Sequence, residues 1–146
     1  MKSKLFMLLL FTIGSTLILN AQTISEKTEI EHITATLVDY IEGSTNGQPN
    51  RLKEAFHPDL NLYYTGKEGE LKTWSGKAYI EDTKEGQPTG EIGKIISIDY
   101  ENDIAVAKVQ ISHPESKIPF IDYFMLIKLK DKWTIIHKMF TKRVNE

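Results

Sequence analysis

The feature that most constrains the fold is a change in hydrophobic periodicity part-way along the chain. Over residues 28–43 the apolar side chains recur every three or four positions, which is the spacing of one helix face. From Leu60 the period falls to two, since Leu60, Leu62 and Tyr64 alternate with more polar neighbours, as in a half-buried strand. Helices concentrated early and strands concentrated late indicate an α+β fold.

Three helices are expected, over residues 28–43, 49–56 and about 76–85, because Pro49 suits a first helical turn and Ser75 can cap the third helix. Beyond Glu91 the sequence predicts strands over 95–100, 104–111, 119–129 and 133–141. These strands are apolar on both faces. We therefore expect a curved antiparallel sheet that wraps around the helices as a cone and leaves a hollow between them.

Composition excludes several classes of protein. The 146 residues contain no Cys, which rules out a disulfide scaffold and a cysteine-ligated zinc site. The 18 Lys and Arg are outnumbered by 20 Asp and Glu, so no basic stripe for nucleic acid is expected. The four His are widely spaced and there is no glycine-rich phosphate loop, so the sequence predicts neither a metal nor a cofactor.

The N-terminal segment has the layout of a secretory signal peptide. Lys2 and Lys4 precede an apolar run over 5–19, and a small residue, Ala21, follows at the expected cleavage point. The run is shorter than the roughly 20 residues that span a bilayer. We expect a signal peptide over 1–21, a polar lead over 22–27 and one domain over 28–146, in the periplasm or outside the cell and without membrane contact. An uncleaved anchor remains open, because Leu19 is bulky for a position so close to the cut.

The last hairpin decides which side chains are expected to face the hollow. With a three-residue loop over 130–132, the paired residues would be Leu129 with Trp133, Ile127 with Ile135, Met125 with His137 and Tyr123 with Met139. The concave face would then carry Tyr123, Met125, His137 and Met139. The convex face would carry Phe124, Leu126, Ile136 and Phe140, and a homodimer through that face would cover them.

Three features of the sequence resemble the nuclear transport factor 2-like superfamily. They are the order of elements, the endings over 122–128 and 132–138, and the segment Phe56-His57-Pro58-Asp59-Leu60-Asn61-Leu62-Tyr63. More narrowly they are similar to its secreted bacterial "putative lumazine-binding" members, over about 28 to 141. The resemblance implies a cone-shaped α+β fold of the cystatin-like roll type and suggests a lumazine-like pterin ligand. It does not fix the function, because this fold hosts isomerases, cyclases, dehydratases, transport factors and binders.

Comparison with ketosteroid isomerase, another member of that superfamily, argues against isomerase activity. An ungapped comparison places Tyr40 at the helix tyrosine of that enzyme and Tyr64 where its base carboxylate stands. Without a base near the substrate carbon, proton abstraction cannot begin.

The favoured function is non-catalytic binding of a small, partly aromatic molecule. The candidate ligand-binding residues are an aromatic wall, two adaptable methionines and one histidine: Tyr40, Tyr64, Trp74, Tyr79, Tyr123, Met125, Met139 and His137. The aromatic residues could equally be plain core, and His137 could be a satisfied core histidine. Two further functions remain open: an enzyme of the polyketide cyclase or dehydratase kind with His137 as acid and base and Tyr40 as donor, or a dimeric protein-interaction module.

Overall fold

The structure is a computed structural model that describes residues 28–144. The expected signal peptide and polar lead lie outside the described residues. By its internal contacts the chain divides into two units, Met1–Glu31 and His32–Glu146. Of the first unit only residues 28–31 are described, and they are helical. None of the helices in the described part is long and apolar enough to cross a membrane.

Within residues 28–144, three helices form where the sequence predicts them. The first runs over residues 28–45 and buries Ile33, Leu37 and Tyr40, which recur at helical spacing. The second, α2 (Pro49–Ala55), begins with its proline in the first turn. In the third, α3 (Gly76–Asp82), the Ser75 hydroxyl accepts a hydrogen bond from the backbone N–H of Ala78 at 3.2 Å, as an N-cap does.

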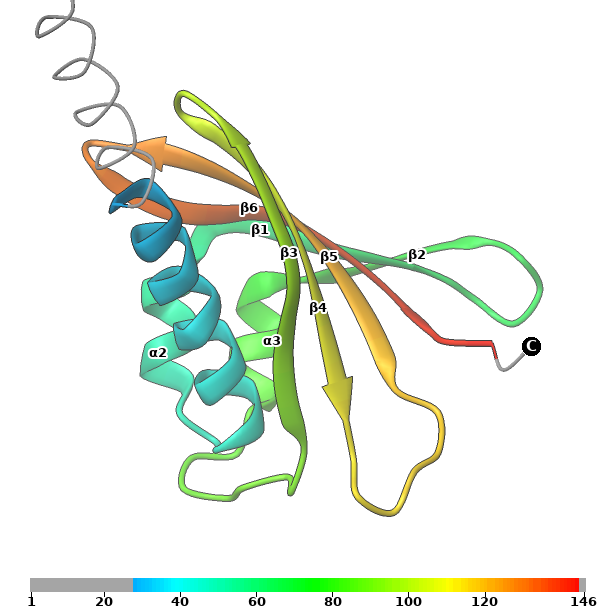
Figure 1. Ribbon diagram of the computed structural model, residues 1–146. Helices are drawn as coiled ribbons and strands as arrows, with labels where there is room; N and C mark the ends of the chain where they lie inside the picture. Colours follow the sequence, from blue (N-terminus) through cyan, green and yellow to red (C-terminus); the bar gives the residue numbers. More distant parts are fainter. Residues whose placement is uncertain (1–27, 145–146) are drawn as a thin grey trace, which may run out of the picture. The chain divides into compact units, whose positions relative to one another are not determined.

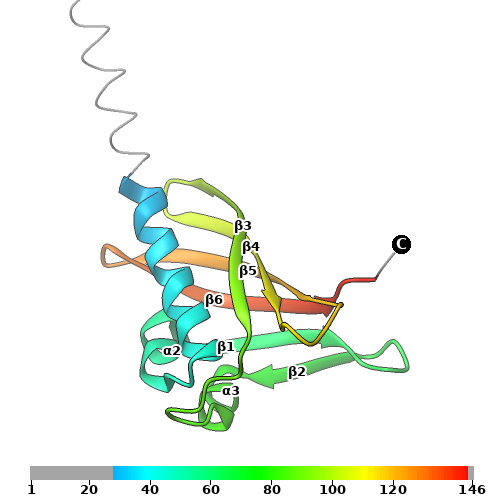
Figure 2. The same ribbon diagram turned by 60° about the horizontal axis from the view of Figure 1, so that its bottom comes forward.

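The six strands of the described part of the chain form a single sheet in the order β2-β1-β6-β5-β4-β3. Their bounds are β1 (Phe56–Thr65), β2 (Leu71–Ser75), β3 (Ile92–Glu101), β4 (Ile104–Ser112), β5 (Phe120–Leu129) and β6 (Lys132–Lys142). The α+β fold class is confirmed, and the sheet is curved with the helices packed on one of its faces (Figures 1 and 2). The sheet is mixed rather than wholly antiparallel, because β1 runs parallel to β6.

The loop between β5 and β6 has two residues, so the expected three-residue loop is wrong. Lys130 and Asp131 both adopt positive φ, 48° and 65°, and Leu129 pairs with Lys132. Two positive φ values in succession are typical of the tight hairpin turn that matches the twist of antiparallel strands. The expected pairs of Leu129 with Trp133 and of Ile127 with Ile135 therefore do not form.

A bulge at Ile136 shifts the register back further along this hairpin. Leu126 pairs with Ile135, but Met125 pairs with His137, so Ile136 is the extra residue. Beyond the bulge the expected pairs of Met125 with His137 and of Tyr123 with Met139 are confirmed.

The two-residue loop and the bulge together reverse the faces expected for β5 and for β6 beyond Ile136. Tyr123, Met125 and Met139 are 47 %, 49 % and 49 % exposed, whereas Phe124 and Leu126 are buried beneath the helices. The inner face therefore carries the even-numbered residues of β5 and, beyond the bulge, of β6. The expected concave residues Tyr123, Met125, His137 and Met139 lie on the outer face, which corrects the prediction.

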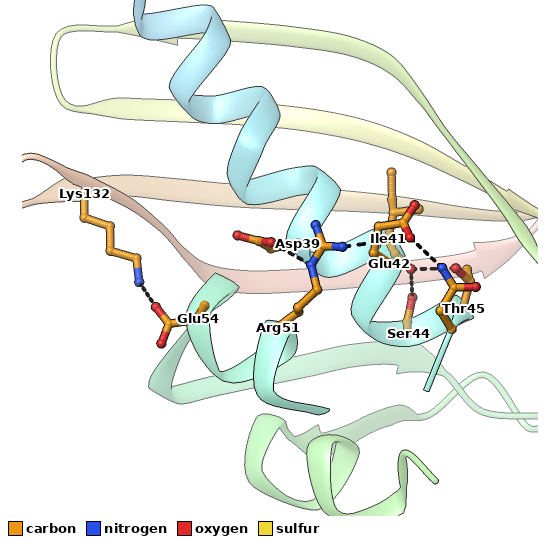
Figure 3. Close-up of polar contacts among 9 residues, drawn as sticks. Asp39, Ile41, Glu42, Ser44, Thr45, Arg51, Glu54 and Lys132 are labelled. Atoms are coloured by element: carbon orange, nitrogen blue, oxygen red, sulfur yellow. Dashed lines mark hydrogen bonds and ion pairs between the residues drawn. The ribbon is translucent and has the colours of Figure 1, made fainter. Parts of the chain in front are cut away.

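Ion pairs at the surface connect α2 to its neighbours (Figure 3). The Arg51 Nε lies 2.8 Å from Asp39 Oδ1 on the 28–45 helix, and the Lys132 Nζ lies 2.6 Å from Glu54 Oε2. The hydrogen bond from Lys132 lowers the pKa of the Glu54 carboxyl. These groups are substantially exposed, so the pairs contribute little to stability and serve mainly to orient the helices.

Candidate functional site

A pocket of about 470 Å³ lies between the helices and the inner face of the sheet. Its wall comes from the 28–45 helix, β2, α3, the 83–91 loop and the inner face of β4, β5 and β6. The residues that carry its chemistry are Tyr40, Trp74, Tyr79, Phe120, Asp122, Lys138 and Phe140. A volume of this size suits a small-molecule ligand.

The 83–91 loop forms the rim of the pocket and is fastened to the end of the 28–45 helix. The backbone N–H of Gly86 donates to the Gly47 carbonyl at 2.8 Å, and the N–H of Thr89 donates to the Thr45 carbonyl at 2.8 Å. These hydrogen bonds hold the loop against the end of the 28–45 helix at the rim of the pocket.

Three polar side chains meet at the floor of the pocket, and we call them the buried triad: Tyr40, Asp122 and Lys138. The Tyr40 hydroxyl donates to Asp122 Oδ2 at 2.6 Å, and the Lys138 ammonium donates to the Tyr40 oxygen at 2.6 Å. Lys138 Nζ also lies 3.1 Å from Asp122 Oδ2, which makes an ion pair. The three residues are only 1 %, 2 % and 4 % exposed, in the order named.

Aromatic rings surround the ammonium of Lys138. Its Nζ lies between 4.6 and 5.8 Å from four ring centroids, those of Tyr40, Tyr79, Phe140 and Phe124. A cation at this distance from ring faces is attracted by their negative quadrupoles, most strongly where water is excluded. The Asp122 carboxylate and the four aromatic rings together compensate the positive charge of Lys138. The pocket floor is therefore polar but carries no net charge.

Burial raises the pKa of the Tyr40 hydroxyl well above its usual range, and the neighbouring Tyr79 and Asp122 raise it further. Tyr40 is therefore a neutral hydrogen-bond donor in the folded protein. In the unfolded chain the hydroxyl ionises at about pH 10.

Because the folded pKa of Tyr40 is raised, its contribution to stability is complete below about pH 10 and declines as the pH rises above that value. We expect the free energy of unfolding to fall with a slope of up to about 1.4 kcal/mol per pH unit in that range. Tyr40→Phe should flatten the slope, whereas Tyr123→Phe, which removes an exposed hydroxyl, should not. Urea denaturation at several alkaline pH values measures this slope. An unchanged slope in Tyr40→Phe would contradict the assignment of the pH dependence to the Tyr40 hydroxyl.

Of the eight predicted ligand-binding residues, Tyr40, Trp74 and Tyr79 line the pocket. Trp74 and Tyr79 meet edge to face with ring centroids 5.0 Å apart, which makes one wall. Tyr64 is not in the lining and stacks on Phe140 at 4.9 Å.

The other four predicted residues lie outside the pocket. Tyr123, Met125 and Met139 are on the outer face, and the His137 ring stacks on Tyr63 with centroids 4.5 Å apart. The hypothesis that His137 acts as acid and base in the hollow is therefore wrong in its geometry, because the bulge at Ile136 turns this side chain away from the inner face.

Sequence reasoning missed two members of the buried triad. Neither Asp122 nor Lys138 is among the predicted ligand-binding residues, yet both side chains are buried. The sequence did contain a signal for them. Asp122 pairs with Phe140 and Phe124 pairs with Lys138, so the acidic and the basic side chain lie diagonally across from each other on one face of the hairpin. Within residues 28–144 no group of three or more His, Asp or Glu side chains could hold a metal ion.

Comparison with known proteins agrees with the fold. The model of the family described as "Putative lumazine-binding" matches residues 28–141, which include the whole of the pocket lining. The chain belongs to this family. The expected membership in the nuclear transport factor 2-like superfamily is likewise confirmed.

One curated relative is the protein named aldolase FrzH from a Cladobotryum species. The present chain is 28 % identical to that relative over 116 residues, which are 77 % of this chain and 90 % of the relative.

Solved structures of nuclear transport factor 2-like proteins are similar along nearly their whole length. The protein from Shewanella baltica OS155 has a TM-score of 0.70 at 21 % identity, covering 81 % of this chain and 96 % of its own. The protein from Methylobacillus flagellatus KT has a TM-score of 0.68 at 26 % identity, covering 80 % and 94 %.

Proposed function

We propose that this protein is an exported domain that binds a small, partly aromatic molecule in the inner pocket. The buried triad carries the proposal. A buried ion pair contributes little to stability compared with apolar residues of the same volume. Its position at the floor of an open pocket is explained if Asp122 and Lys138 recognise a ligand.

The walls of the pocket fit the same proposal. Trp74 and Tyr79 stand on one side, and Phe120 and Phe140, with ring centroids 6.4 Å apart, stand on another. Ligand pockets combine mostly apolar walls with a few convergent polar groups that fix orientation. The description of the family supports a lumazine-like ligand as the first candidate.

Native mass spectrometry of the protein purified from its own host tests the proposal. A retained small molecule of stoichiometric mass is expected, and an empty protein under conditions that preserve folding would count against ligand binding.

The pocket wall can be tested with a matched pair of aromatic substitutions. Trp74→Ala should weaken binding of the retained molecule at least about tenfold, because it removes a large contact surface from the wall. Tyr123→Ala should leave the affinity unchanged, because Tyr123 lies on the outer face. Isothermal titration calorimetry on both variants measures the difference; equal losses would show that the pocket is not where the ligand binds.

The second candidate is an aldol-type enzyme, favoured by the curated relative named an aldolase. The buried triad supplies groups for such chemistry. The Asp122 carboxylate could take a proton from the carbon beside a substrate carbonyl, leaving the electron pair on the enolate oxygen, which Lys138 would stabilise. Deuterium exchange at that carbon of the retained molecule, lost in Asp122→Asn, would support catalysis; no exchange by the wild-type protein would exclude it.

A homodimer through the outer face of the sheet completes the proposal. Val106 and Met125 pair across β4 and β5 and are each 49 % exposed, with Tyr123 and Met139 nearby on the same face. Exposed apolar side chains on one sheet face are typical of protein interfaces. Sedimentation of the wild-type protein as a dimer and of Met125→Lys as a monomer is expected; a wild-type monomer at high concentration would rule out the dimer.

A further inference from the structure

From the geometry of the buried triad we infer the chemical class of the ligand, an inference that rests on the proposed function. The pocket floor recognises an uncharged planar ring that presents an N–H donor and a carbonyl acceptor side by side, as amides and imides in heterocycles do. Asp122 accepts from the N–H and Lys138 donates to the carbonyl.

The acceptor on the protein is the second carboxylate oxygen of Asp122. Both polar contacts of this side chain, from Tyr40 and Lys138, involve Oδ2. Among residues 28–144, no buried side-chain oxygen or nitrogen lacks a hydrogen-bond partner. Oδ1, which takes part in neither contact, is therefore reached from the pocket that Asp122 lines.

The donor on the protein is the ammonium group of Lys138. An ammonium carries three hydrogens and no acceptor. One hydrogen is directed to the Tyr40 oxygen, and Asp122 Oδ2 lies 3.1 Å from the Nζ atom as the ion-pair partner. With both of these neighbours satisfied, a further hydrogen is left for a ligand, and Lys138 also lines the pocket. The free carboxylate oxygen and the free N–H thus belong to two groups that touch each other.

The charge of the floor selects against ions. A carboxylate on the ligand would meet Asp122, and an ammonium on the ligand would meet Lys138, so either ion would face a like charge in a site with little water. A neutral ring edge with one donor and one acceptor satisfies both groups. A site built to hydrogen-bond an N–H discriminates strongly against an analogue that lacks it, because its own buried group is then left unpaired.

Two probes of the same shape test the inference on the wild-type protein. Lumazine has ring N–H groups beside carbonyls, whereas 1,3-dimethyllumazine keeps the flat body and the carbonyls and replaces both of these N–H groups by N-methyl. We expect lumazine to bind at least about tenfold more tightly. Titration calorimetry measures both affinities, and quenching of tryptophan fluorescence, with Trp74 in the pocket wall, gives an independent readout.

A matched pair of protein variants assigns the effect to the triad. Asp122→Asn should abolish the preference for lumazine, whereas Asp103→Asn, the same change at an exposed residue outside the lining, should retain it. If Asp122→Asn does not fold, the comparison of probes on the wild-type protein still decides. Equal affinities, or no binding of either probe, would overturn the inference. A small molecule retained in the native mass spectrum would in that case still support the proposed function.

Discussion

Replacing Asp122 with alanine is expected to lower the free energy of unfolding by about 3–5 kcal/mol. The substitution leaves the Lys138 ammonium buried among aromatic rings with only the Tyr40 oxygen as a polar partner. Removing one member of a buried pair is costly because the other charge loses its compensation without regaining water. Denaturation in guanidinium chloride near neutral pH measures the loss.

The double variant Asp122→Leu with Lys138→Met is the control for this prediction. It removes both charges and replaces them with apolar side chains of similar size, so most of the lost stability should return. The same double variant should no longer distinguish lumazine from its dimethyl analogue. A double variant as unstable as Asp122→Ala would mean that the loss arises from packing at Asp122 and not from the unpaired charge.

The elements could be predicted from the sequence because each has a local cause. The 28–45 helix follows from the spacing of Ile33, Leu37 and Tyr40, and the bounds of α2 follow from Pro49 and the extended residues after it. The strands follow from their period of two. Tyr40 could be placed toward the sheet because a helix has only one apolar face, and the structure places it there.

The orientation of the last strand could not be predicted in the same way. Residues 133–140 are apolar on both faces, so the pattern alone does not say which face is buried. The turn carries Lys130 and Asp131 at positive φ, where glycine or asparagine would have marked a two-residue loop. The bulge at Ile136 leaves no mark in the sequence, because any apolar residue can occupy it.

The triad itself was within reach of the sequence. The register past the bulge was predicted correctly, and it places Asp122 and Lys138 diagonally on one face together with Phe124 and Phe140. An acid and a base among aromatic residues indicate a buried pair more readily than a solvated edge, since both charges are then compensated. The error lay in choosing the face with His137 as the inner one.

Deleting Ile136 is expected to leave the protein folded, with a loss of only about 1–2 kcal/mol in the free energy of unfolding. Ile136 is the extra residue between the pair of Leu126 with Ile135 and the pair of Met125 with His137, so its removal joins two segments that are already in register. In the resulting regular strand Trp133, Ile135 and Lys138 all fall on the inner face, because side chains alternate between the two faces. Circular dichroism and denaturation measure the outcome.

The substitution Ile136→Ala separates the bulge from its side chain. Ile136 is only partly buried, so trimming it should cost about 1–2 kcal/mol while the bulge and the pocket persist. The variant should therefore bind the retained ligand like the wild-type protein. A deletion that costs several times more stability than this substitution would contradict the prediction, and would mean that the fold needs the bulge itself.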